Sequence, residues 1–296
     1  MGSSAVAARR TGVAMNGHKV RKGILTFLKY FSLVFFSFCS IAPIIYCLLT
    51  AAKTNEEYAT TQVTTLPKNF FNLSSYINAW SRADMGKAFL NSFIVLVFVL
   101  AISIIIGSQL AFVLSRFKFP GNGLVRGLFM VASMVPGVAM QVTVYNIMYQ
   151  TGLINHLYGY IVLMCGTDVI SIYIFIQFIE NISTSIDESA IMDGASYFRI
   201  YRTIIFPLLK PAIVTSMVLK GVNTYNEFYM SHLYLEMASP KIYTVSTCLN
   251  VFVGPMGNQY NLICAGVIIS LIPALIVFIL CQKQIYSGLT NGAVKG

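Results

Sequence analysis

Charged side chains are scarce in this sequence. Only 10% of its 296 residues are Asp, Glu, Lys or Arg, while 56% are hydrophobic, and the mean hydropathy is +0.72. A soluble globular protein carries about 25% charged residues, so these few charges could not cover a water-exposed surface. An aromatic fraction of 13% also excludes a disordered chain. The composition therefore predicts an integral membrane protein.

Several chemical motifs are also missing from the sequence. There is no G-x-x-x-x-G-K-[ST] loop to hold a nucleotide phosphate. The histidines are only His18, His156 and His232, and the six cysteines form no C-x-x-C pair or metal-ligand spacing. No Ser/His/Asp set or carboxylate pair falls in a credible site. We therefore expect no catalytic residue, no metal and no cofactor on this chain, and an energy source elsewhere if it pumps.

Apolar runs are what the sequence has in abundance. A membrane-spanning helix needs about 20 predominantly apolar residues, and six segments are long enough. The first is too long for a signal peptide and is expected to stay uncleaved, while Pro136-Gly137 interrupts the third. The pattern predicts an all-α membrane protein with six transmembrane helices. The runs cover residues 29–52, 89–115, 127–150, 158–178, 208–231 and 262–285.

Basic residues decide the expected orientation. If both termini are inside, the inner segments carry fourteen Lys or Arg, five before the first span, Lys29 at its first residue and eight beyond it, against five in the outer loops. The positive-inside rule then predicts cytoplasmic N and C termini, and the net charge of +10 needs no nucleic acid to explain it. Residues 1–28 form a basic cytoplasmic segment and residues 29–296 the membrane domain. The inner loops are 116–126 and 179–207, and the outer loops are 53–88 and 232–261.

The second inner loop has the pattern of a short helix. Ser185 followed by Glu188 reads as a capping box, and Asp187 in the first turn suits the helix dipole. Gly194 is expected to end this helix, and a second helical stretch over 197–205 follows before the next span. Two interpretations stay open: a surface that docks in a groove on a partner protein, or an ordinary solvated loop with an interfacial helix.

The same loop resembles the EAA loop of ATP-binding-cassette importer permeases. It reads Glu-Ser-Ala, then Gly after three intervening residues, then Ile-Ile-Phe-Pro after nine more. Ser189 stands in place of the middle Ala and Phe206 in place of Leu. The resemblance covers residues 181–207 and implies that the loop couples to an ATPase. The residues it marks for this role are Glu188, Ser189, Ala190, Asp193, Gly194 and Ala195.

Other stretches resemble the carbohydrate-uptake class of these permeases. They are residues 134–137 (Met-Val-Pro-Gly), residues 225–228 (Tyr-Asn-Glu-Phe, where the class usually begins with Trp) and the ending at 288–296, which is similar to the maltose-type G subunit. The resemblance implies the maltose-type ABC importer permease fold in a bacterial inner membrane. It also implies a heterodimer with a sister permease, two ATPase subunits that bind ATP and Mg, an extracytoplasmic solute-binding protein, and a sugar as substrate.

The fifth run is the most polar of the six. Its groups Asn223, Tyr225, Asn226 and Glu227 combine hydrogen-bonding and aromatic side chains, as sugar recognition requires, and polar groups in a span usually face the bundle interior or a wet cavity. They are the predicted translocation-path residues. The alternative is that they join helices within the permease pair.

A Gly- and Pro-rich turn interrupts the second outer loop. Gly254, Pro255, Met256 and Gly257 allow a sharp protruding turn. By resemblance to maltose-type G subunits, this turn would enter the cleft of the solute-binding protein and displace sugar. A plain turn is the alternative.

Two charges inside the runs complete the predictions. Asp168 and Lys220 both fall near the predicted bilayer midplane, where an unpaired charge is costly. An ion pair between them is therefore one hypothesis. The alternative is that each charge faces the aqueous path. Such charges would also suit an ion-coupled secondary transporter, although they are few. Further alternatives are a scaffold protein, and an importer of a non-sugar solute such as a glycerol phosphate ester.

Overall fold

The computed structural model describes the backbone from residue 3 to 293 and the side chains from 22 to 282, except at residues 63, 167, 239 and 256. Every regular element in these ranges is a helix, which confirms the all-α prediction. The chain divides into two compact units. One contains Met1–Tyr76 with Tyr260–Ile268, and the other contains Ile77–Gln259 with Ile269–Gly296.

The first unit is joined by a buried polar cluster. It contains α1 (Ser3–Ala51), α2 (Asn55–Thr60), the first residues of α3 (Ser74–Arg82) and the first residues of α14 (Tyr260–Ala293). The Asn261 amide donates to Asn55 Oδ1 at 2.6 Å, and Ser75 Oγ donates to the Lys53 carbonyl at 2.9 Å. Lys53 is buried and its Nζ donates to the Gln62 carbonyl at 3.1 Å. These bonds fasten the start of α14 to the end of α1.

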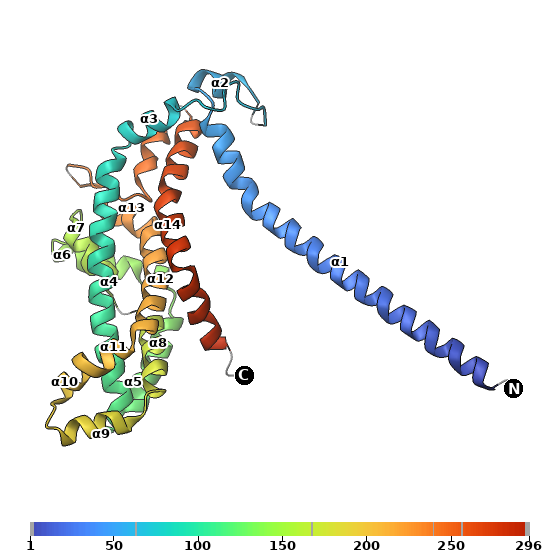
Figure 1. Cartoon of the computed structure of the whole chain (residues 1–296). Coiled ribbons are helices and arrows are strands. Elements are labelled where there is room, and N and C mark those ends of the chain that lie inside the picture. The colour runs from blue at the N-terminus through green and yellow to red at the C-terminus, as the bar shows by residue number, and fades with distance from the viewer. Residues whose placement is uncertain (1–2, 63, 167, 239, 256, 294–296) are drawn as a thin grey trace. The chain divides into compact units, whose positions relative to one another are not determined.

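The second unit is built around three helices, α4, α8 and α12, which lie side by side (Figure 1). Their apolar side chains form one continuous core that also takes in α9 to α11. The elements of this unit before α14 are α4 (Met85–Arg116), α5 (Asn122–Met134), α6 (Gly137–Gln150), α7 (Leu157–Met164), α8 (Val169–Glu180), α9 (Thr184–Met192), α10 (Tyr197–Ile200), a π-helical turn (Tyr201–Ile205), α11 (Phe206–Leu208), α12 (Lys210–Asn226), α13 (Tyr229–Leu235) and a 3-10 turn (Cys248–Phe252).

Small residues allow α4 and α8 to approach closely. A Cβ placed on Gly107 would lie 3.5 Å from the Phe175 ring, so that ring packs against the helix backbone. Ser108 and Ala111 are fully buried on the same helix. Apolar helices gain little hydrophobic energy by associating in lipid, and close packing through small residues is the main alternative.

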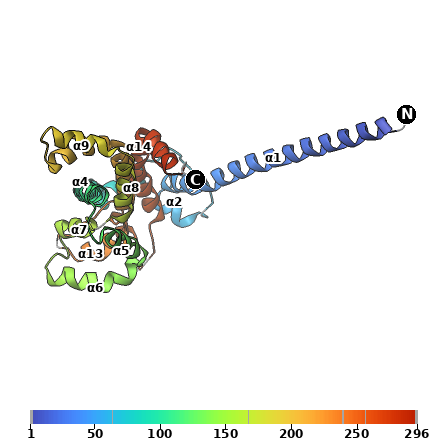
Figure 2. The same cartoon turned by 90° about the horizontal axis from the view of Figure 1, so that it is seen from below.

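Three helices are long and apolar enough to cross a membrane, and three bent helix pairs bring the total to six if each pair is one span. The long stretches are Lys22–Ala51, Met85–Arg116 and Tyr260–Gln282. The predicted interruption at Pro136-Gly137 is confirmed, because α5 and α6 meet there at 97°, and Figure 2 shows them diverging. Pro136 has no N–H and cannot continue the ladder of α5.

The fourth span departs from the prediction of a continuous helix, because it is broken between α7 and α8 with a bend of 47°. The third bend, of 72° between α11 and α12, lies at the start of the predicted fifth span and does not interrupt it. Pro211 in the first turn of α12 lacks the N–H that would continue the preceding helix. The predicted fifth span over 208–231 is also too long, because α12 ends at Asn226 and α13 starts at Tyr229.

Each pair of loops predicted to share a membrane side meets at one end of the second unit. Arg116 contacts Asp187 at 2.6 Å at the end that carries α9, the lower end in Figure 1. Arg82 donates to Gln259 Oε1 at 2.9 Å at the other end. We call these the α9 end and the α13 end.

The turn into α7 should not tolerate a side chain at Gly159. An added Cβ would lie 1.8 Å from the Leu153 carbonyl oxygen, a backbone atom that cannot rotate away. Gly159→Ala should therefore destabilise the fold by about 1–3 kcal/mol or more, seen as a lower melting temperature in detergent. Gly123→Ala, in the open first turn of α5, is the control and should melt like the parent. Equal melting of the two variants would contradict this packing.

Candidate functional site

The loop at the α9 end begins with a capped helix, whose cap lies two residues earlier than predicted. The cap is Ser183, whose Oγ accepts from the Ser185 N–H at 3.3 Å. The proposed capping box from Ser185 to Glu188 is therefore wrong, since Ser185 already lies inside α9. Its hydroxyl instead meets the Ser183 hydroxyl at 2.7 Å.

Gly194 ends α9 as predicted, and the structure supplies the reason. Its φ is +79°, a left-handed conformation that favours glycine. The N–H of Ala195 donates to the Ala190 carbonyl and that of Gly194 to the Ile191 carbonyl, both at 2.9 Å, which is the Schellman pattern. A Cβ on Gly194 would meet nothing within 4 Å. The backbone favours glycine here, and the space beside it is open.

The six residues marked by the EAA resemblance divide into two groups. Ala190 is buried and Ala195 partly buried in the core of the second unit, where they anchor the two sides of the helix end. The others face outward, and an apolar patch beside them is also exposed, with Met192 at 87% and Phe198 at 65%. The exposed polar members are Glu188, Ser189 and Asp193, the exposed glycine is Gly194, and the patch consists of Ile191, Met192, Tyr197 and Phe198.

A buried ion pair holds α9 against the end of α4. Arg116 Nε lies 2.6 Å from Asp187 Oδ2, and the two side chains are only 8% and 12% exposed. Arg116 also donates from Nη2 to the Ile182 carbonyl at 3.0 Å. Burial raises the pKa of the Asp187 carboxyl, and the Arg116 guanidinium opposes that shift. The Asp187 carboxylate is therefore protonated at a higher pH than a solvated carboxylate at the same distance from Arg116 would be.

The sequence analysis missed this pair and a second one nearby. Arg126 on α5 lies 2.7 Å from Glu180 at the end of α8, and its carbonyl accepts from the Tyr173 hydroxyl at 2.6 Å. In the sequence, the signal for these two ion pairs was a basic residue just after an apolar run and an acidic residue in the next inner loop. That pattern does not say which acid each arginine meets.

The predicted path residues lie where α12 breaks into α13. Asn223 and Asn226 are exposed on one face of α12 together with Leu219 and Val222. Their amides are therefore presented away from the body of this chain.

Tyr225 and Glu227 make bonds within the chain at the same break. The Tyr225 hydroxyl donates to the Ser270 carbonyl at 2.7 Å. Glu227 Oε1 accepts from the Met230 N–H at 2.9 Å and so caps α13, while its carbonyl accepts from Ser246 Oγ at 2.8 Å. The Glu227 carboxylate thus satisfies an N–H group in the first turn of the helix that follows the break.

The hypothesis that Asp168 pairs with Lys220 is wrong. Asp168 is the N-cap of α8, and its Oδ2 accepts from Ser171 Oγ at 2.6 Å. The prediction assumed a continuous fourth span, whereas the break before α8 leaves free N–H groups that this carboxylate satisfies. Lys220 is partly buried and takes part in none of the ion pairs among the described side chains.

The predicted protruding turn has a closed neck. The Gln259 N–H donates to the Phe252 carbonyl at 3.0 Å, and the Gly257 N–H to the Gly254 carbonyl at 3.1 Å. Gly257 has a φ of +117°, and Pro255 is exposed. Met256 lies outside the described residues.

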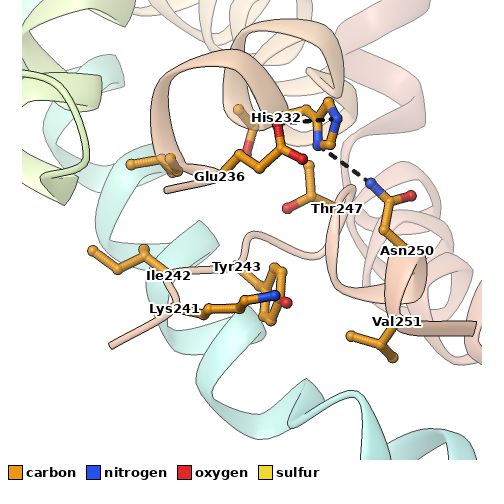
Figure 3. Close-up of a pocket in the computed structure, with 10 residues that line it drawn as sticks. His232, Glu236, Lys241, Ile242, Tyr243, Thr247, Asn250 and Val251 are labelled. Carbon is orange, nitrogen blue, oxygen red and sulfur yellow. Dashed lines mark hydrogen bonds and ion pairs between the residues drawn. The ribbon is translucent and has the colours of Figure 1, made fainter. Parts of the chain in front are cut away.

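A pocket of about 400 Å³ with a mixed polar and apolar lining lies between α13 and residues 241–251, and nothing in the sequence pattern indicated it (Figure 3). The His232 ring stacks on Phe228, its Nδ1 lies 3.4 Å from the Asn250 amide nitrogen, and its Nε2 lies 3.5 Å from Glu236. Nδ1 accepts from the Asn250 amide when the hydrogen of the neutral ring is on Nε2. The lining residues are Ser231, His232, Leu235, Glu236, Lys241, Ile242, Tyr243, Thr247, Asn250 and Val251.

A family model described as "Binding-protein-dependent transport system inner membrane component" matches residues 100–290, from α4 to α14. The chain belongs to this family. It is therefore a permease-type membrane subunit rather than a catalytic one, and it works with other transporter subunits and a binding protein.

Similar proteins agree with this membership. The Melibiose/raffinose/stachyose import permease protein MelC of Bacillus subtilis is 28% identical over 86% of this chain and 91% of its own length. The Probable starch degradation products transport system permease protein AmyC of Thermoanaerobacterium thermosulfurigenes is 29% identical over 93% and 98%. One chain of a bacterial ABC transporter involved in the import of the acidic polysaccharide alginate has the same fold, with a TM-score of 0.77 over 88% and 96% of the two chains at 22% identity.

The Arg116–Asp187 pair should matter far more for stability than the Arg126–Glu180 pair. Asp187→Asn leaves a buried guanidinium without its counter-charge and should cost about 3 kcal/mol. Glu180→Gln is the matched control; because that pair is more exposed, at 29% and 47%, it should cost about 1 kcal/mol or less. The melting temperatures of the two variants in detergent compare them directly. Equal shifts in melting temperature would show that the buried pair does not contribute more to stability than the exposed pair.

Proposed function

We propose that this chain is the transmembrane permease subunit of an ATP-driven, binding-protein-dependent importer of sugars or oligosaccharides. The observation that carries the proposal is the geometry of α9. Its outer surface presents Glu188, and the exposed apolar patch extends from its last turn onto α10, while its inner surface is fixed to α4 by the Asp187–Arg116 pair. A surface of this kind fits a groove on an ATPase subunit. The ion pair between Asp187 and Arg116 then transmits movement of the ATPase from α9 to α4 and the other spanning helices.

The proposed topology has six spans, three of them bent, with both termini in the cytoplasm of a bacterial cell. The excess of basic residues in the inner segments supports this orientation. The α9 end is then cytoplasmic, where two ATPase subunits carrying ATP and Mg would dock. The α13 end faces the extracytoplasmic solute-binding protein.

A sister permease is the proposed partner within the membrane. The amides of Asn223 and Asn226 are exposed on α12, and lipid cannot hydrogen-bond to them. A second permease facing this surface would enclose a wet path between the two subunits. Amide groups there suit sugar hydroxyls, and the names of both permease relatives refer to carbohydrates or their breakdown products.

One observation favours a second candidate, an importer of an anionic solute such as a glycerol phosphate ester. Lys220 is partly buried within a span and takes part in none of the ion pairs among the described side chains. A phosphate on the solute would offset the cost of that charge. An ion-coupled secondary transporter gains less support, since Asp168 is engaged in capping α8.

The docking assignment can be tested at Gly194. Asp and Asn both tolerate the left-handed backbone, so Gly194→Asp and Gly194→Asn keep the helix end while filling the open space beside it. Both variants should insert in the membrane but lose most of the co-purifying ATPase and ATP-driven sugar uptake. Glu188→Ala should act in the same direction but more weakly, through a lost charge contact. Normal ATPase recovery in the Gly194 variants would overturn the assignment.

The protruding turn can be tested by deletion. Removing residues 254–257 shortens the turn outside the neck bond between Gln259 and Phe252, so the fold should persist. Uptake should be abolished while the assembled complex is recovered in normal amount. Pro255→Ala, which keeps the length of the turn, serves as the control and should retain most uptake. Unchanged uptake after the deletion would remove any role of the turn in sugar release.

A further inference from the structure

The last turns of α3, just before the long helix α4, present three different faces. Ala79 and the following Ala83 are buried, whereas Asn78 and Ser81 are exposed and polar. The third face is apolar and exposed, and the Ile77 and Trp80 side chains that form it are 65% and 47% accessible. A helix needs only two kinds of face when one side packs on protein and the other side meets a single environment, either water or lipid. The three faces of α3 therefore indicate that its exposed side meets both.

The orientation of this helix is held by its final residue. The Arg82 guanidinium lies 5.4 Å from the centre of the Phe252 ring and donates to Gln259 Oε1 at 2.9 Å. Residues two apart on a helix point in nearly opposite directions. Fixing Arg82 against the body of the second unit therefore directs Trp80 away from it.

The apolar face of α3 continues onto a helix that is long and apolar enough to span a membrane. The Trp80 ring stacks on Phe89 of α4 at a centroid distance of 5.9 Å. Leu90 and Phe93 follow on α4 and are exposed. The exposed apolar surface thus runs without interruption from α3 onto the side of α4.

The charges that flank α4 place this junction at the edge of the bilayer. Lys87 and Arg116 are 29 residues apart, or about 44 Å of helix. A bilayer including its headgroups is about 40–45 Å thick. Phe89 is two residues, or about 3 Å of helix, inward from Lys87, so Phe89 and Trp80 lie within the headgroup layer at the α13 end, close to the acyl chains.

We propose that α3 is an interfacial helix that lies along the membrane surface, with Ile77 and Trp80 inserted at the boundary between lipid headgroups and acyl chains. In this position the polar face with Asn78 and Ser81 stays in water. A docked protein that covered every exposed side of α3 would bury these polar groups instead. An amphipathic helix with an aromatic residue at this depth gains apolar burial and keeps its polar side hydrated. The anchor would fix the entry of α4 into the membrane, whatever solute is carried.

The chain offers a direct test, because Trp80 is its only tryptophan. The full chain, reconstituted in phosphatidylcholine nanodiscs, is excited at the tryptophan band. Some nanodiscs carry a nitroxide quencher high on the acyl chain and others carry it near the chain end. The shallow quencher should reduce emission about twofold more than the deep one, and acrylamide in the water should quench weakly. Trp80→Phe, which removes the emission, controls for background.

A matched pair of variants separates insertion from folding. Ile77→Asp places a carboxylate on the apolar face and should reduce quenching by the shallow probe about twofold, since a charge resists entry into the acyl region. Asn78→Asp places the same group one residue away on the wet face and should leave quenching unchanged. Strong acrylamide quenching of the parent chain, or protection that appears only when the solute-binding protein is added, would overturn the proposal.

Discussion

The close approach of α4 to α8 is the contact on which the rest of the second unit depends. Gly107 lets the Phe175 ring rest on the helix backbone, and the buried Ser108 and Ala111 keep the two helices near each other. In lipid such packing replaces the hydrophobic effect as the source of association. It brings the ends of both helices together, so that Arg116 can reach Asp187 and the loop helix α9 acquires a fixed position.

Breaks in the spanning helices account for several polar side chains that look functional in the sequence. Each break frees backbone N–H groups that lipid cannot satisfy. Asp168 accepts from the first turn of α8, and Glu227 accepts from the first turn of α13. An acidic residue within an apolar run can therefore serve the backbone, and the break has to be located before the residue is assigned to transport.

The EAA pattern combines folding and docking requirements in one short segment. Ala190 and Ala195 are small because they pack into the core on either side of the helix end, and Gly194 is favoured by its positive φ. Glu188, Ser189 and Asp193 meet no such demand, since they are exposed. The division explains why a change of Ala to Ser at 189 is compatible with this fold.

The sequence alone was sufficient for the membrane class, the helical fold, the interruption at Pro136-Gly137 and the family, because each depends on composition, local backbone chemistry or a local motif. The tertiary structure decided which charges meet. The Asp168–Lys220 pair failed because it assumed a continuous fourth span, whereas the Arg116–Asp187 pair joins residues 71 positions apart. Bend angles and helix contacts determine such distances, and both result from packing over the whole chain rather than from any local pattern.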